Sequence, residues 1–162
     1  MFFSFLAAIF IHEMGHILFA RIFGVRIRSF RWCTAGAILE FDFSHCGYLV
    51  ETLIHLAGAL CGVTSALIIH AIGGVSTEFL GISVFLAVIN LLPIRGFDGG
   101  AALYAVLEQF LFVDTAWKIS SVVSIITTVI LWLAVIWCEI RVGANLELLI
   151  FVLIVLYRTT AK

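Results

Sequence analysis

The first apolar stretch of the chain, FIHEMGHILFA at residues 10–20, contains three ionisable side chains. His12, Glu13 and His16 fit the pattern H-E-x-x-H. Residues four apart lie on one face of a helix, so both imidazoles can reach one ion and the glutamate lies beside it. Zinc takes neutral imidazole ligands and lowers the pKa of a bound water to about 7. The pattern therefore predicts a hydrolytic zinc site with Glu13 as general base, and Gly15 would let another backbone come close.

The composition favours this interpretation over a chance match to a five-residue pattern. Hydrophobic residues make up 64% of the 162 residues, charged residues make up 12%, and the mean hydropathy is +1.23. Since a soluble domain carries about a quarter charged residues, we expect the chain to be solvated by lipid. Polar groups deep in a membrane are costly and usually functional. The net charge of -1 gives nucleic-acid binding no support, and the four cysteines, which lack CxxC spacing, indicate neither a disulfide framework nor a zinc ribbon.

A third metal ligand is expected, because two histidines leave a catalytic zinc one protein ligand short. The segment NLLPIRGFDGG, residues 90–100, offers Asp98 after Pro93, the one proline of the chain. Pro93 should end the third apolar helix, and non-helical chain at membrane depth must line a protein or water cavity. Asp98 is equally suited to a turn or an N-cap ahead of a helix expected at Gly100–Phe110, and the two roles are compatible.

The expected fold class is an all-α integral membrane protein with about five transmembrane helices and a small β-hairpin at the membrane surface. Five apolar runs supply the helices: Phe2–Ala20, Tyr48–Ile72, Phe79–Leu92, Trp117–Cys138 and Leu146–Tyr157. Alternation of apolar and polar residues over Val25–Phe43 predicts the hairpin, whose open edge must face protein, water or a bound peptide. We expect a single domain over residues 1–162, with a catalytic core at about 5–105 and accessory helices at about 117–157.

The basic residues predict the orientation in the membrane. If the first helix runs from outside to inside, eight of the nine lysines and arginines lie on the cytoplasmic side and only Arg141 lies outside. Met1–Ala20 lacks a basic n-region and an A-x-A-like exit, so we interpret it as a retained helix and not as a signal peptide. Because this helix begins almost at residue 1, a further helix upstream is expected in the natural protein.

The paired motifs, HEMGH and the Asn90–Gly99 segment, resemble the site-2 protease family of intramembrane zinc metalloproteases. The compact layout resembles the sporulation branch, which cleaves a membrane-associated pro-sigma factor. The resemblance covers about residues 5–105 and implies regulated intramembrane proteolysis in a bacterial cell membrane, with a multi-pass chain whose active site is toward the cytoplasm. It implies a membrane-associated protein substrate and membrane regulatory proteins as partners. It also implies one catalytic Zn²⁺ held by His12, His16 and Asp98, with Glu13 as general base, and a substrate groove shaped by Asn90, Pro93 and Gly99.

The chain departs from the family pattern in two places. The family often has Ala-Gly-Pro-x-x-Asn in its second core helix, whereas residues 57–62 here read AGALCG, without the proline or the asparagine. The family's Pro-Phe-Gly-Gly-like stretch is replaced by TAGA at residues 34–37. The first departure bears on substrate handling more than on zinc binding.

Three other functions stay open. A CAAX-type membrane protease can also use H-E-x-x-H, although no matching downstream glutamate motif is present. A membrane di-iron desaturase or hydroxylase would need a larger histidine cluster than the five histidines of this chain can supply. A non-catalytic zinc-binding membrane scaffold descended from a protease is compatible with the altered stretch at residues 57–62.

Other polar residues have less specific interpretations. His45 and Cys46 fit a solvated loop better than a metal site, because they do not recur at ligand spacing. His55, four residues after Glu51, could orient a zinc ligand or belong to a polar pair near the cytoplasm. Arg95 is better suited to a lipid headgroup than to a substrate carboxylate.

Overall fold

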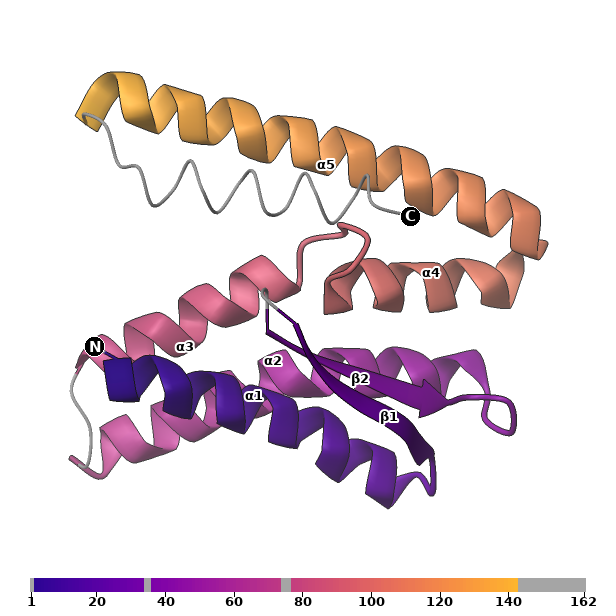
Figure 1. The fold of residues 1–162 in the computed structure, drawn as a ribbon, viewed down its shortest axis with the longest axis horizontal. Coiled ribbons are helices and arrows are strands. Elements are labelled where there is room, and N and C mark those ends of the chain that lie inside the picture. The colour runs from indigo at the N-terminus through magenta and orange to yellow at the C-terminus, as the bar shows by residue number, and fades with distance from the viewer. Residues whose placement is uncertain (1, 34–35, 74–76, 143–162) are drawn as a thin grey trace. The chain divides into compact units, whose positions relative to one another are not determined.

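The computed structural model describes residues 2–33, 36–73 and 77–142 (Figure 1). Within these ranges the chain forms five α-helices and one antiparallel hairpin. The chain divides into two compact units, Met1–Leu91 and Leu92–Lys162. The first unit contains the H-E-x-x-H motif, and the second contains Asp98.

The first unit has three helices at the predicted places: α1 at Phe2–Ile22, α2 at Tyr48–Ala71 and α3 at Thr77–Asn90. The third helix was expected to reach Leu92 but ends two residues earlier. The residue before a proline is disfavoured in the α region, so Leu92 cannot continue the helix into Pro93. The helix-ending role predicted for Pro93 is confirmed.

Two apolar clusters join the elements of the first unit. One cluster centres on Ala8 of α1, Ala66 of α2 and Phe79 of α3. The other centres on Ala20 and Val25, at the end of α1 and after it, and on Ile54 of α2. His12 and His16 lie on α1 between the residues that these clusters use, so packing on both sides fixes the segment that carries the motif.

Gly15 lies where α1 and α2 approach each other closely. A Cβ atom built at Gly15 would lie 2.7 Å from the carbonyl oxygen of Ala57, 2.8 Å from Cβ of Cys61 and 3.0 Å from Cα of Gly58. Two of these atoms are backbone and cannot move aside without moving the helix. The close backbone approach predicted for Gly15 is confirmed, and the partner is α2.

Gly15→Ala is therefore expected to force α1 and α2 apart and to destabilise the protein by about 1–3 kcal/mol, the usual cost of overpacking. Thermal unfolding in detergent measures the loss. Gly81→Ala on α3 is the matched control, because a Cβ at Gly81 meets nothing within 4 Å. Equal unfolding temperatures for the Gly15→Ala variant and the wild type would contradict the close contact.

The predicted hairpin is confirmed, with β1 at Arg26–Cys33 and β2 at Gly36–Asp42. The strands pair antiparallel from Arg26↔Asp42 to Cys33↔Gly36, and the register shifts between Ile27 and Ser29. The described residues place no third strand beside them. The hairpin thus keeps main-chain edges at which no described strand pairs.

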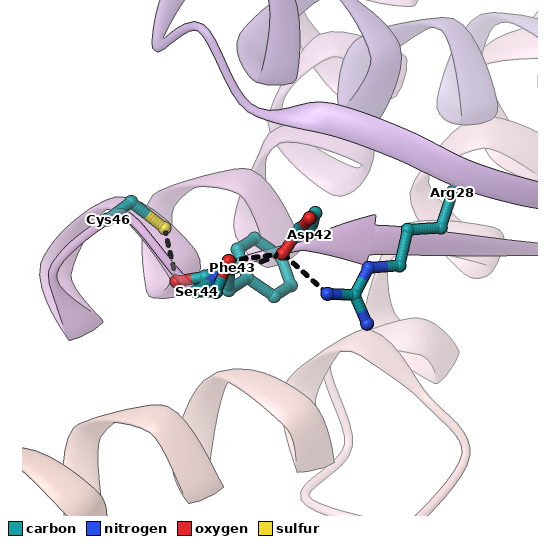
Figure 2. A network of polar contacts seen from close by, with 5 residues as sticks. All are labelled: Arg28, Asp42, Phe43, Ser44 and Cys46. Atoms are coloured by element: carbon teal, nitrogen blue, oxygen red, sulfur yellow. Dashed lines mark hydrogen bonds and ion pairs between the residues drawn. The ribbon is translucent and has the colours of Figure 1, made fainter.

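A polar network closes the open end of the hairpin (Figure 2). Asp42 Oδ1 accepts hydrogen bonds from Arg28 Nη2 at 2.8 Å, from Ser44 Oγ at 2.6 Å and from the Ser44 backbone N–H at 3.2 Å. The Cys46 thiol donates to the carbonyl oxygen of Phe43 at 3.4 Å. These bonds tie β1 to the turn that leads into α2.

The Asp42 bonds predict a pH dependence of the hairpin. The Ser44 hydroxyl, and after it Arg28, lower the pKa of the Asp42 carboxyl from its ordinary 3.8 to about 2. A lowered pKa means that the carboxylate stabilises the hairpin fully above pH 3.8, and that this stabilisation is lost as the pH falls through about 2. An NMR titration of the Asp42 carboxyl carbon should therefore have its midpoint near 2.

Ser44→Ala removes the hydroxyl that contributes most to the lowered pKa of Asp42, so it should raise the midpoint of the Asp42 titration toward 3.8. Thr64→Ala is the control, because the Thr64 hydroxyl bonds within α2 to the carbonyl oxygen of Leu60. A wild-type midpoint at 3.8 would rule out the network in solution.

The second unit begins with the non-helical residues 92–97, followed by α4 at Asp98–Phe110 and α5 at Val113–Val142. The helix expected from Gly100 begins two residues earlier, and the N-cap role suggested for Asp98 is wrong. Phe97 occupies the cap position with extended backbone (φ −109°, ψ 161°), so Asp98 is the first helical residue. A carboxylate in the first turn still interacts favourably with the positive end of the helix dipole.

Gly100 shapes the turn in front of α4. A Cβ atom at Gly100 would collide with the carbonyl oxygen of Ile94 and lie 2.6 Å from the Ile94 carbonyl carbon. Ile94 itself is fully buried. The glycine thus lets the segment after Pro93 fold back over the start of α4 and fixes the position of Asp98 within its unit.

Three helical segments among the described residues are long and apolar enough to cross a membrane: Phe2–Ile22, Tyr48–Ala71 and Val113–Arg141. α3 has 14 residues, and at about 1.5 Å per residue it is shorter than a hydrocarbon core of about 30 Å. The described part has five helices: α1, α2, α3 and α5 correspond to four of the five expected apolar runs, and α4 is the helix expected separately near Gly100–Phe110. The run predicted at Leu146–Tyr157 lies outside the described residues.

Candidate metal centre

The two histidines of the motif form a close, buried pair on α1. His12 and His16 are each only 4% exposed. Their Nε2 atoms lie 3.3 Å apart, and their ring planes cross at 80°. One helical turn separates the residues, so the backbone of α1 alone brings the rings together, as the spacing predicts.

A backbone carbonyl of α2 orients the second ring. His16 Nδ1 lies 2.8 Å from the carbonyl oxygen of Ile54, in a buried hydrogen bond. Because a carbonyl oxygen only accepts, Nδ1 must carry the hydrogen, and the neutral ring then has its lone pair on Nε2. That lone pair lies on the side of His12 Nε2. Histidines that bind metals usually donate their other N–H to such a partner, which fixes tautomer and orientation.

The pair fits the geometry of a zinc ion. Tetrahedral coordination with Zn–N bonds of about 2.0–2.1 Å places two ligand nitrogens roughly 3.3 Å apart. The Nε2 atoms of His12 and His16 are separated by 3.3 Å. Imidazole nitrogens at this separation in a buried site match the ligand type and spacing of zinc.

Gly58 of α2 lies against both rings. A Cβ atom at Gly58 would collide with His16 Nε2 and would lie 2.7 Å from His16 Cε1 and 2.9 Å from His12 Cε1. Ala57, Ala59 and Gly62 are also buried on α2. Gly58, inside the AGALCG stretch where the sequence departs from the family pattern, thus leaves room for the two imidazole rings.

Glu13 and Asp98 are both half-buried. Glu13 follows His12 directly on α1, and Asp98 begins α4 in the second unit. The side chains of His12, His16 and Asp98 are of the types that can hold a metal ion, and Asp98 stays the predicted third ligand.

The three residues predicted to shape a substrate groove differ in their surroundings. Asn90 ends α3 and donates from Nδ2 to the carbonyl oxygen of Leu86 at 3.0 Å. Pro93 lies in the non-helical segment, and Gly99 is buried in the first turn of α4. Their part in substrate binding stays a prediction.

Arg95 is held within the second unit. Its guanidinium lies 4.9 Å from the Trp117 ring centroid, and its Nη1 donates to Ser121 Oγ at 3.4 Å. Its backbone N–H donates to Ser124 Oγ at 2.9 Å. These contacts join the turn after Pro93 to α5, a structural role that the sequence did not indicate.

His45 and Cys46 lie in the turn between β2 and α2, beside a cavity of about 280 Å³. Burial raises the pKa of the Cys46 thiol, which keeps it protonated and makes it a poor metal ligand. The interpretation of these two residues as a loop is thus supported.

His55 packs against Phe43, with ring centroids 5.5 Å apart, and its Nε2 lies 4.0 Å from Glu51 Oε1.

The hydrogen-bond partner of His16 Nδ1 is the main-chain carbonyl of Ile54, the residue before His55. Sequence reasoning missed both Ile54 and Gly58, since neither a backbone carbonyl nor a missing side chain has a residue-type signature. Gly58 and Gly62 have the G-x-x-x-G spacing that is typical of close helix packing, but only Gly58 is in tight contact here, since a Cβ at Gly62 would meet nothing within 4 Å.

No protein-family model matches this chain, and no curated protein matches it significantly.

Proposed function

We propose that the chain is an intramembrane zinc metalloprotease of the site-2 protease type. It hydrolyses a peptide bond of a membrane-associated protein near the cytoplasmic face of a bacterial cell membrane. The observation that supports this most strongly is the buried histidine pair, with Nε2 atoms 3.3 Å apart and His16 Nδ1 bonded to Ile54, in a helix of membrane-spanning length. Polar rings in an apolar membrane-spanning helix are energetically costly, and binding an ion is a function that accounts for them.

In this proposal one zinc ion would be held by His12, His16 and Asp98. When bound, zinc would act as a Lewis acid toward water and the peptide carbonyl. Asp98 contributes a negative charge, which reduces the net charge that the membrane interior has to accommodate. Three protein ligands are the number that catalytic zinc sites usually have, and these residues would supply that number.

Glu13 moves the proton. Its carboxylate accepts a proton from the attacking water while the water oxygen bonds to the carbonyl carbon. It then delivers that proton to the amide nitrogen as the C–N bond breaks. Its place next to a ligand histidine on a packed helix positions it for both transfers, and general acid–base catalysis of this kind contributes about 10²–10⁴-fold.

The substrate binds in an extended form. A helical segment hides its carbonyl groups in i to i−4 hydrogen bonds, so the segment must unwind before cleavage. Addition as a strand beside β1 or β2 would satisfy its main chain through a ladder of hydrogen bonds. A pro-sigma factor or another regulatory protein at the membrane fits this mode, with membrane regulatory proteins controlling its access.

A non-catalytic zinc-binding scaffold is the second candidate. The observation that favours it is the AGALCG stretch at residues 57–62, which lacks the family's proline and asparagine. A scaffold needs the two histidines but has no use for Glu13.

The two candidates are separated by comparing the wild type with Glu13→Gln. Bound zinc is measured on the purified full chain, and new protein N-termini are identified by mass spectrometry in membranes of cells expressing each form. The protease predicts N-termini that depend on Glu13, whereas the scaffold predicts identical sets.

A further inference from the structure

Gly58 has an environment that differs from that of its neighbours on α2. Its missing Cβ position lies against His16 Nε2, the atom that the proposed function assigns to the metal, and 2.9 Å from His12 Cε1. Gly62 lies one turn further along the same helix and is also buried, yet a Cβ there would meet nothing within 4 Å. The requirement for glycine is therefore local to the imidazole rings.

Helix packing alone does not account for this contact. Gly15 already provides the close approach of the two backbones, since its Cβ would meet Ala57, Gly58 and Cys61 of α2. The atoms nearest to a Cβ at Gly58 are instead ring atoms of His16 and His12. A methyl group there would press on the coordinating edge of one ring while the Ile54 carbonyl holds the opposite edge through Nδ1.

We propose that Gly58 is a positioning residue that keeps the coordinating edge of His16 open and thereby sets the affinity of the site for a divalent metal. The proposal rests on the proposed metal site and adds a residue of α2 to it. Ile54 and Gly58, one turn apart on α2, hold the two sides of the same imidazole: one fixes Nδ1 by a hydrogen bond, and the other leaves room at Nε2.

The test is a Co²⁺ titration of the full chain in detergent, followed by absorption spectroscopy. Gly58→Ala should weaken Co²⁺ binding by about 10- to 100-fold, the range seen when partners of ligand histidines are lost, and should alter the ligand-field bands. Gly62→Ala, the matched control, should bind as the wild type does. Wild-type affinity and bands in folded Gly58→Ala would overturn the proposal. Failure of the wild type and of Gly62→Ala to bind would instead overturn the metal site itself.

A double-mutant cycle on the metal-free protein covers the case in which Gly58→Ala is too unstable to titrate. In a wild-type background Gly58→Ala should lower the unfolding temperature. In a His16→Ala background the ring is absent and the same change should lower it much less. Equal losses in both backgrounds would show that the cost comes from helix packing and would overturn the role assigned to Gly58.

Discussion

Replacing Glu13 by glutamine is expected to abolish peptide cleavage and to leave bound zinc unchanged. Glutamine keeps the shape of the side chain but cannot accept a proton from water at neutral pH. Removing a general base costs about 10²–10⁴-fold in rate, which is enough to take cleavage below detection in a membrane preparation. Two measurements are needed: metal content by mass spectrometry, and the rate at which new N-termini form.

Glu78→Gln is the matched control for this experiment. Glu78 is exposed in the first turn of α3, so the same chemical change there should leave both measurements unaltered. If Glu13→Gln cleaves as the wild type does, Glu13 is not the base. If it loses zinc, the glutamate belongs to the ligand set and the proposed division of roles fails.

Asp98→Ala is expected to lose zinc and, with it, all cleavage. The two histidines that remain would provide two of the three protein ligands that a catalytic zinc needs. Loss of a direct ligand should exceed the 10–100-fold loss of affinity, roughly, that follows removal of an outer hydrogen-bond partner. Competition against a chelator of known affinity measures the change.

Asp114→Ala is the control for Asp98→Ala. Both aspartates lie in the first turn of a helix, Asp98 in α4 and Asp114 in α5, so both lose the same favourable helix-dipole interaction. Zinc bound in full by the Asp98→Ala variant would exclude Asp98 from the ligands and would leave the histidine pair without its proposed third partner.

Much of the described fold could be predicted from the sequence, because its signals are local. Apolar runs longer than 18 residues predicted α1 and α2, and period-2 alternation predicted the hairpin. Element ends were less accurate: α4 begins at Asp98 and not at Gly100. An aspartate ahead of a helix resembles an N-cap, whereas here Phe97 takes that position with its backbone alone.

Only the side chains of the candidate site could be predicted from the sequence. His12 and His16 are one helical turn apart, so their meeting depends on α1 alone. The Ile54 carbonyl and the space at Gly58 depend on the packing of α2 against α1. The residue types at these positions do not predict that packing. When a main-chain carbonyl orients a ring, or a glycine leaves space for it, the sequence shows at most a spacing of small residues such as that of Gly58 and Gly62.

The hydrogen bond from His16 to Ile54 can form only after α2 has been synthesised. The two residues are 38 positions apart, so the imidazole has no such partner while the first helix alone has left the ribosome. At a translation speed of about 5–20 residues per second, α2 follows within seconds. Until α2 arrives, both tautomers of His16 are accessible, so the orientation of this ring depends on the second helix.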